Sequence, residues 1–199
     1  MKKVTLITLF SIGMLAFTTA PIGYQVGDTA TDFSLKGVSG KMVSMSSYEG
    51  AKGYIVVFTC NSCPYSVAYE DRIIALHDKY GTKGFPVIAI NPNDDEKSPK
   101  DSYLLMKVRA TEKDFPFAYV YDATQEVTKS YGATNTPHVY VLDKNKEVRY
   151  IGAIDNNTRD GAAADKKYVE DAVDALLLGD QVSNTKTKAI GCTIKWAAK

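Results

Sequence analysis

Neither sign of charge dominates this sequence of 199 residues. Lysine and arginine together number 24, aspartate and glutamate 23, and the formal net charge is +1 at pH 7. A protein that binds nucleic acid usually has a marked basic excess, because it must neutralise a line of phosphates. The balanced charge therefore predicts no nucleic-acid partner.

The sequence also lacks an apolar run long enough to cross a bilayer. Its most apolar segment, residues 4–17, is shorter than the ~20 residues that a transmembrane helix needs. Lys2 and Lys3 precede this segment and small residues up to Ala20 follow it, as in a secretory signal. We therefore expect residues 1–20 to be a signal peptide, the mature protein to be periplasmic or secreted, and no stable membrane span to remain. The alternative is a buried N-terminal strand or helix of a cytosolic protein.

Motifs for nucleotide binding and for hydrolysis are missing as well. There is no glycine-rich phosphate loop and no Ser-His-Asp set, and the only histidines are His77 and His138. No internal repeat or low-complexity block divides the chain. The sequence therefore predicts one main domain with no cofactor and no resident metal.

Cysteine is scarce, but its placement is informative. The three cysteines are Cys60, Cys63 and Cys192, an odd number for an exported protein. One thiol must then stay free, or the pairing must alternate between partners. A bridge from Cys60 to Cys63 would close a very small loop and constrain the unfolded chain little. This pair is therefore expected to be redox-active rather than structural.

What the sequence does contain is an alternation of strand and helix patterns. Continuous β-branched and aromatic runs predict buried strands, and apolar residues spaced by three and four predict amphipathic helices. Strands are expected at 54–58, 85–90 and 117–122 and twice within 138–153; helices are expected at 64–81, 98–112, 125–131 and 169–177. Residues 32–45 add two short strands at the N-terminal side.

This order predicts an α/β domain with a central mixed β-sheet flanked by helices and an N-terminal β-hairpin extension. We assign residues 24–180 to the domain and residues 181–199 to a C-terminal tail that packs on it.

The two close cysteines fall where a buried strand meets a helix. Cys60 follows the strand at 54–58, and Cys63 directly precedes the helix that begins at Pro64. The unpaired N–H groups and the positive dipole end of a helix favour the thiolate, which is the form that attacks disulfides. We expect Cys60 to be the exposed, more acidic nucleophile and Cys63 to resolve the mixed disulfide.

The chain resembles the thioredoxin-like redoxin superfamily from about Asp32 to Leu178. The motifs that carry the resemblance are DFSL, VVFTCNSCP, and TPHVYVLD followed by VRYIGAID. A closer resemblance is to a subgroup of thioredoxin-domain proteins with CNxCPY, AINPND, TPHV and a terminal GCTIKW, all present here. The resemblance implies a thioredoxin fold and a cis peptide at Thr136-Pro137 that faces the cysteines. Its backbone would be open to pair with an extended substrate peptide.

The chain departs from these relatives at several positions. The buried aspartate of thioredoxin would fall near Tyr54, so an acid is missing there; Glu70 or Asp71 could substitute, although we expect both to be solvated. The threonine that peroxiredoxins need three residues before their cysteine is replaced by Val57 or Cys60, which disfavours efficient peroxide reduction.

Three further residues are candidates for accessory roles. His138 could complete a copper site with the two thiols, but copper-delivery proteins of this fold have CxxxCP and this chain has CxxCP. Cys192 is either a third redox partner or a buried or spare thiol. Glu70 could assist proton transfer.

The sequence thus predicts an exported thiol-disulfide oxidoreductase that exchanges disulfides with partner proteins through Cys60 and Cys63. Thr136 and Pro137 would shape the substrate groove. The alternatives are a copper-binding or copper-delivery module and a thiol peroxidase. The oligomeric state, the partner's identity and the direction of electron flow are not specified by the sequence.

Overall fold

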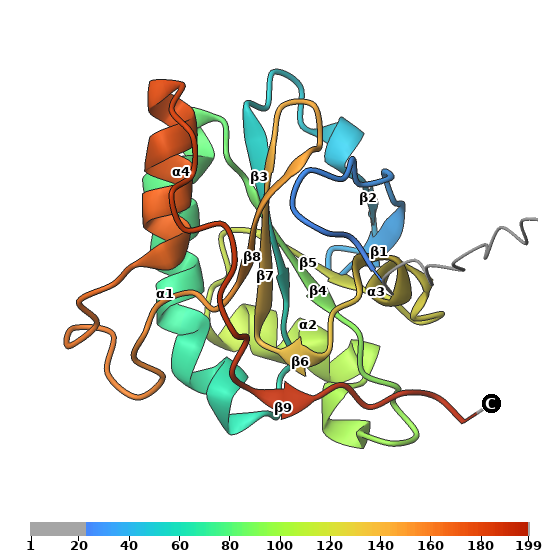
Figure 1. The fold of residues 1–199 in the computed structure, drawn as a ribbon. Helices are drawn as coiled ribbons and strands as arrows, with labels where there is room; N and C mark the ends of the chain where they lie inside the picture. The colour runs from blue at the N-terminus through green and yellow to red at the C-terminus, as the bar shows by residue number, and fades with distance from the viewer. Residues whose placement is uncertain (1–22, 199) are drawn as a thin grey trace, which may run out of the picture.

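A computed structural model describes residues 23–198, which form a seven-stranded sheet with helices packed against it (Figure 1). The signal peptide expected at residues 1–20 lies outside these residues. In chain order the elements are β1 (Leu35–Gly37), β2 (Met42–Val43), η1 (Met45–Ser47), β3 (Gly53–Phe58), α1 (Pro64–Tyr80), η2 (Gly81–Lys83), β4 (Val87–Asn91), η3 (Pro99–Asp101), α2 (Tyr103–Glu112), β5 (Ala118–Tyr121), α3 (Glu126–Tyr131), β6 (Asn135–Thr136), β7 (His138–Asp143), β8 (Val148–Gly152), α4 (Tyr168–Leu178) and β9 (Cys192–Thr193).

The strands of the sheet lie in the order β2-β1-β5-β4-β3-β7-β8. Strand β3 runs parallel to β4 and antiparallel to β7, so the sheet is mixed. The β1–β2 hairpin extends the sheet beyond β5, because β1 pairs with β5 in antiparallel fashion and β2 forms the edge. The predicted α/β architecture, with its N-terminal hairpin extension, is confirmed.

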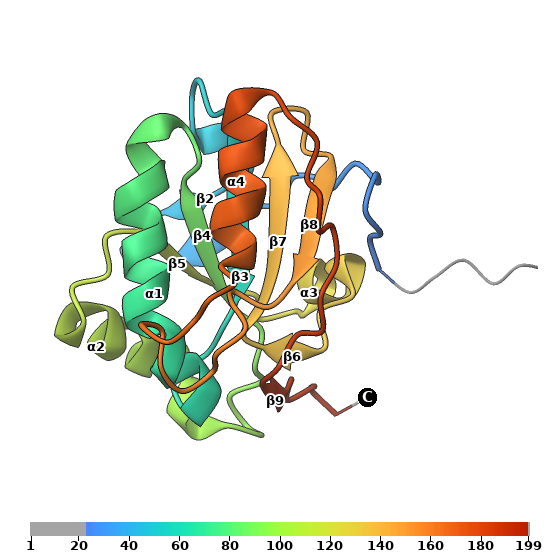
Figure 2. The same cartoon turned by 60° about the vertical axis from the view of Figure 1, so that its left-hand side comes forward.

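Both faces of the sheet are covered, which explains the continuous apolar runs in the sequence. Along β3, Ile55 and Val57 face one apolar cluster with α1, α2 and α4, while Val56 and Phe58 face a second cluster. The second cluster also contains Tyr131 of α3 and residues of the N-terminal segment. Figure 2 shows α1 and α4 side by side in front of the sheet. Alternation along a strand sends successive side chains to opposite faces, so a strand covered on both faces is apolar throughout.

One predicted helix is divided into two pieces. The sequence favoured a single helix over 98–112, but the structure has the 3₁₀ turn η3, then an extended Ser102 (φ −59°, ψ 153°), then α2. The reason is Asp101, whose buried side chain turns toward the loop between the cysteines instead of capping a helix. The break at Ser102 lets the chain place Asp101 inward and still begin α2 on the surface.

Two short strands, β6 and β9, were not predicted. They pair with each other outside the main sheet, with Thr136 opposite Cys192. The tail that contains β9 leaves α4, runs along β8 and then crosses the end of the sheet where α1 begins (Figures 1 and 2). Within residues 23–198, no helix is both long enough and apolar enough to span a membrane.

Candidate functional site

Cys60 and Cys63 lie at the junction that the sequence predicted. Strand β3 ends at Phe58, Cys60 lies in the connection, and Cys63 is the N-cap of α1 with Pro64 at the first helical position. Proline is favoured there because its missing N–H would have no partner in the helix. All three cysteines are unbridged in this structure.

The expected exposure of Cys60 is wrong. Cys60 is 3% exposed and Cys63 is 4% exposed, so neither sulfur is open to solvent. The cause is tertiary, because segments distant in sequence cover this end of the sheet.

The Thr136-Pro137 peptide bond is cis, as the resemblance implied, and Thr136 touches both cysteines. Its hydroxyl oxygen lies 3.2 Å from the Cys60 sulfur. The Cys63 thiol donates to its carbonyl oxygen at 3.3 Å. Thr136, the first residue of the pair that the resemblance pointed to, therefore contacts both thiols.

The expectation of an open backbone edge at this position is wrong. Strand β9 pairs with β6, so Thr136 already has Cys192 as its partner in an antiparallel ladder. The side chain of Asn135 donates to the carbonyl of Gly191 at 2.9 Å. An extended peptide from another protein could pair with this edge only after β9 has moved.

Asp101 holds the loop between the two cysteines. One of its carboxylate oxygens accepts the backbone N–H groups of Asn61 and Ser62, both at 2.9 Å. The other accepts the hydroxyls of Ser62 (3.0 Å) and Ser98 (2.6 Å) and the side-chain amide of Asn93 (2.8 Å). A fully buried carboxylate with five donors is a rigid anchor, because losing any donor would leave buried charge uncompensated.

Asp101 was not predicted from the sequence to be a site residue. It lies in a Ser-Pro-Lys-Asp stretch that is typical of a helix start, and nothing local links it to the cysteines. The signal that was available is the polar run NPND before it, since polar residues that follow a buried parallel strand gather at the functional edge of such sheets.

The acidity of the two thiols is opposite to the prediction. The pKa of Cys63 is lowered from 9.0 to about 4, first by the Cys60 thiol, which donates to its sulfur, and against the effect of burial. The Cys192 thiol and the backbone N–H groups of Ser66 and Cys192 also donate to it. The Thr136 carbonyl favours the protonated form, but these donors outweigh it.

The pKa of Cys60 is raised, first by its hydrogen bond to Cys63, then by burial and by the negative charge of Asp101. The sequence argument was correct that the start of α1 favours a thiolate. It placed the helix start correctly but assigned this benefit to Cys60, whereas Cys63 is the N-cap and receives the backbone N–H of Ser66.

Glu70 is not solvated, contrary to expectation. Its carboxylate receives two hydrogen bonds from Arg109 of α2, at 2.7 and 2.6 Å, and its side chain is only 5% exposed. It lines a small cavity together with Cys60 and Tyr119. Asp71, its neighbour, is exposed as predicted. Glu70 is therefore tied into an ion pair rather than free to move a proton.

His138 packs away from the thiols. Its Nδ1 accepts the backbone N–H of Thr134 at 3.4 Å, and its ring lies 5.0 Å from that of Tyr140. Burial lowers its pKa to about 4, so it is neutral at physiological pH. Among residues 23–198, no three His, Cys, Asp or Glu side chains are arranged to hold a metal ion.

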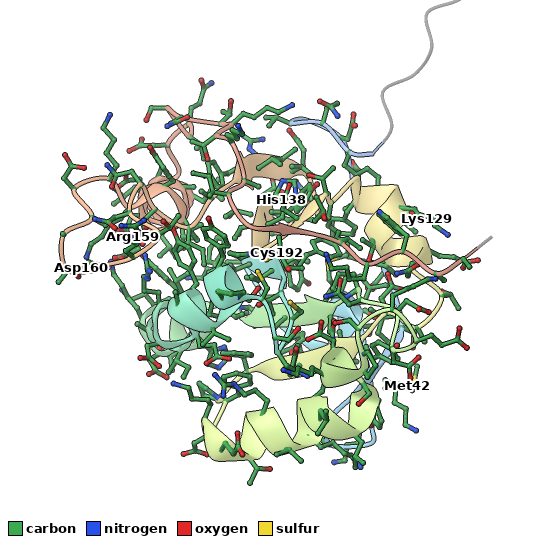
Figure 3. The ribbon with its side chains drawn as sticks, turned by 90° about the horizontal axis from the view of Figure 1, so that it is seen from below. Met42, Lys129, His138, Arg159, Asp160 and Cys192 are labelled. Carbon is green, nitrogen blue, oxygen red and sulfur yellow. The ribbon has the colours of Figure 1, made fainter. Side chains whose placement is uncertain are left out.

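Cys192 is the third sulfur at this end of the sheet. Figure 3 looks onto this end and labels Cys192 and His138. Burial and the neighbouring Cys63 raise the pKa of Cys192 to about 11. Two of the three predicted accessory residues thus lie close to the thiol pair, Cys192 beside Cys63 and Glu70 beside Cys60.

Several known proteins resemble this chain. Thiol-disulfide oxidoreductase ResA of Geobacillus kaustophilus is 28% identical over 154 residues, which cover 74% of this chain and 82% of that protein. The crystal structure of a conserved protein from the same organism, described as uncharacterized, has a TM-score of 0.83 at 35% identity and covers 88% of this chain and 94% of its own. A hypothetical protein of Sinorhizobium meliloti follows, with a TM-score of 0.82, 31% identity, and coverage of 89% and 97%.

The family model described as Redoxin matches residues 25–170, which include β1 to β8, both clustered cysteines and the cis proline. The sequence motifs, the mixed sheet and this match agree, and the chain belongs to the redoxin family.

Proposed function

We propose that this protein is a thiol-disulfide oxidoreductase that exchanges disulfides with partner proteins through Cys63 and Cys60. One observation carries the proposal: Cys63 is the N-cap of α1, Cys60 lies in the connection before it, both are unbridged, and both sulfurs contact Thr136 of the cis-proline turn. The names of relatives such as thiol-disulfide oxidoreductase ResA support the same activity. No cofactor is required, because both electrons come from the two thiols.

The reaction begins with the Cys63 thiolate. It attacks one sulfur of a partner disulfide, forms a mixed disulfide and releases the partner's other sulfur as a thiolate. The Cys60 sulfur then attacks Cys63, and the second partner sulfur leaves. The enzyme ends as a Cys60–Cys63 disulfide, and the partner's two thiolates take up the proton of Cys60 and one proton from solvent.

The hydrogen bond between the two sulfurs sets the order in which the two cysteines act as nucleophiles. While Cys63 is a thiolate, its contact with Cys60 is the main reason that the pKa of Cys60 is high, so Cys60 stays protonated. Once Cys63 is bonded to a partner, it has no negative charge and this cause disappears. Cys60 then loses its proton more easily, at the step where a second nucleophile is needed.

We further propose that the protein is exported, with residues 1–20 as signal peptide, residues 24–180 as the thioredoxin-like domain and residues 181–199 as the tail. The flanking lysines of the N-terminal apolar segment support export. Cysteines that cycle between thiol and disulfide suit an oxidising compartment, where disulfide-bonded partners persist.

A trapping experiment tests the proposal with single-thiol variants. In Cys60→Ser/Cys192→Ser only Cys63 remains, so mixed disulfides with exported proteins should accumulate as reducible bands on a non-reducing gel. The matched variant Cys63→Ser/Cys192→Ser has only Cys60, whose pKa is raised by burial, and should trap few or none. If only Cys63→Ser/Cys192→Ser, the variant that keeps Cys60, traps proteins, the assignment of Cys63 as the nucleophile is wrong.

The same variants separate the alternatives. If neither traps a protein while the reduced wild type binds copper(I) tightly, the copper-delivery alternative replaces the oxidoreductase. If the wild type consumes hydrogen peroxide rapidly and Cys63→Ser does not, the peroxidase alternative replaces it.

A further inference from the structure

The tail of this chain occupies the position that a substrate peptide would need. Strand β9 pairs in antiparallel fashion with β6, and the N–H of Ile194 donates to the carbonyl of Thr134 at 3.2 Å. A Cβ on Gly191 would lie 2.1 Å from the carbonyl oxygen of Thr136. Only glycine permits this close approach, and it precedes a cysteine.

The tail is fixed on both sides of the thiols. Before the site, Thr187 donates its N–H to Ile151 of β8 at 2.9 Å. After it, the side chain of Ile194 is buried in the core. Further on, the backbone N–H of Lys195 donates to Asn93 at 2.9 Å, and its carbonyl accepts from Gln125 at 2.8 Å. The segment between these anchors is therefore held at a defined position over the site.

Three cysteines are brought together as a result. The Cys63 sulfur lies 3.3 Å from the carbonyl oxygen of Thr136, and Thr136 is the residue opposite Cys192 in the β6–β9 ladder. The Cys60 and Cys192 thiols are both hydrogen-bond partners of the Cys63 sulfur. The other side-chain contacts of the Cys60 sulfur are the hydroxyls of Ser66 and Thr136. Cys192 therefore has a partner of its own in Cys63, and that partner is the more acidic thiol.

We propose that Cys192 is a second resolving thiol, which forms a disulfide with Cys63 and closes β9 over the site. This proposal rests on the proposed function, because it assumes that Cys63 is the sulfur bonded to the partner.

The covalent steps balance without an added reagent. A partner displaces β9 and its disulfide is attacked by the Cys63 thiolate, as above. When β9 returns, the Cys192 sulfur attacks Cys63, a Cys63–Cys192 disulfide forms, and the partner leaves as a dithiol that has taken one proton from Cys192 and one from solvent. Cys60 can then attack Cys63, which transfers the bond to Cys60–Cys63 and restores the Cys192 thiol.

The proposal also gives the site a means of releasing its partner. The returning strand competes with the partner's peptide for the same backbone groups of β6 and supplies a nucleophile at the same moment. An ordinary CxxC pair supplies only the nucleophile.

The test uses the full chain with Cys60→Ser, oxidised under native conditions by glutathione disulfide. The expected product is an internal disulfide, seen as a loss of about 2 Da and as a cross-link between the Cys63 and Cys192 peptides after proteolysis. A stable mixed disulfide of Cys63 with glutathione, with no internal bond, would overturn the proposal. Cys60→Ser/Cys192→Ser is the reference for that mixed disulfide.

A second variant tests the placement by β9. In the Cys60→Ser background, Gly191→Val should slow formation of the internal disulfide by about 100-fold, the effect of misplacing reacting atoms by an ångström. Ile190→Val, at the exposed neighbouring position, should leave the rate unchanged. Equal rates in the two variants would contradict a role for the strand.

Failure of this inference can be told apart from failure of the proposed function. The variant with Cys63 alone tests partner exchange without Cys192. If Cys60→Ser/Cys192→Ser traps partners but Cys60→Ser forms no internal disulfide, the proposed function holds and Cys192 is not a resolving thiol. An internal disulfide in Cys63→Ser would contradict the central position of Cys63.

Discussion

At the scale of single residues, Asp101 supplies the buried acid near the thiols that the sequence lacks at its expected position. The position where thioredoxin has its buried acid is occupied here by Tyr54, which packs in the apolar core. Asp101 brings a buried negative charge to the site from a different segment, and this charge contributes to the raised pKa of Cys60. A buried acid is therefore present near Cys60, and it also holds the loop backbone.

Replacing Asp101 with asparagine should destabilise the protein by about 1–3 kcal/mol, since an amide cannot accept all five donors and some buried groups lose their partner. Urea unfolding of the reduced protein measures this loss. Removing the charge should also lower the pKa of Cys60, observed as faster alkylation of Cys60 in a Cys63→Ser/Cys192→Ser background. Asp95→Asn, at an exposed position nearby, is the control and should change neither value. Unchanged stability in Asp101→Asn would contradict the anchoring role.

The pKa of Cys63 should make stability depend on pH. A group whose pKa is lower in the folded protein stabilises the fold above its unfolded pKa and loses that contribution as pH falls through the folded pKa. For Cys63 the window runs from 9.0 down to about 4. The difference in unfolding free energy between reduced wild type and Cys63→Ser should therefore shrink as the pH is lowered through this window.

Cys60 does not disturb that measurement below pH 9. Its pKa is raised in the folded protein, so its contribution is complete below the unfolded pKa and is lost only as the pH rises through the folded value. Urea titrations at several pH values within the window measure the effect. A difference that stays flat with pH would show that Cys63 is not the acidic thiol.

At the scale of elements, an ion pair connects α1 and α2, two of the three helices that pack against one face of the sheet. Glu70 of α1 is almost fully buried and bound by Arg109 of α2, with Lys113 at 3.7 Å as a second cation. Because Glu70 also lines the cavity beside Cys60, this pair helps to fix α1, the helix that Cys63 caps. The Glu70–Arg109 ion pair therefore holds α1 in position and does not take part in proton transfer.

Arg109→Met should therefore cost about 1–3 kcal/mol of stability, because it removes the bidentate partner of a buried carboxylate and leaves that carboxylate short of donors. Asp71→Asn breaks only the pair between Lys113 and an exposed carboxylate, and should change stability by less than about 0.5 kcal/mol. Chemical denaturation of both variants compares them directly. Similar costs for the two substitutions would show that burial does not strengthen the Glu70 pair.

At the scale of the whole molecule, the chain closes on itself through its tail. The segment after α4 runs along the edge strand β8, crosses the thiols as β9 and continues beyond α3 toward the C-terminus (Figure 1). Strand β8 is the edge of the sheet on that side, and covering an edge strand reduces its pairing with other molecules. One segment thus protects a sheet edge and covers the reactive sulfurs.

Export is the prediction that concerns the whole chain. Protein purified from its native host should begin near Pro21, because a signal peptide is removed during export. Its N-terminal sequence, determined from separate cytosolic and extracytosolic fractions, measures this. An intact Met1 in the cytosolic fraction would contradict export.

The sequence by itself determined the elements, their order and the identity of the chemistry. Strands buried on both faces are apolar throughout, and helices on the surface have apolar residues every three or four positions, so local pattern was sufficient to predict β3, β4, β7 and α1. The CxxC pair at a strand-to-helix junction was likewise visible as a short motif, and the cis peptide at Thr136-Pro137 followed from the resemblance to redoxins.

Only the tertiary structure decided which thiol is acidic and what covers it. Acidity depends on the donors and charges around each sulfur, and these come from Asp101, Thr136 and Cys192, which are far from the pair in sequence. Strands β6 and β9 have two residues each, too short to show any periodicity, and each forms only because the other is beside it. Hydrogen bonding and burial between distant segments leave no local pattern, and for that reason the reversal of the two cysteines and the closing of the groove by the tail could not be predicted from the sequence.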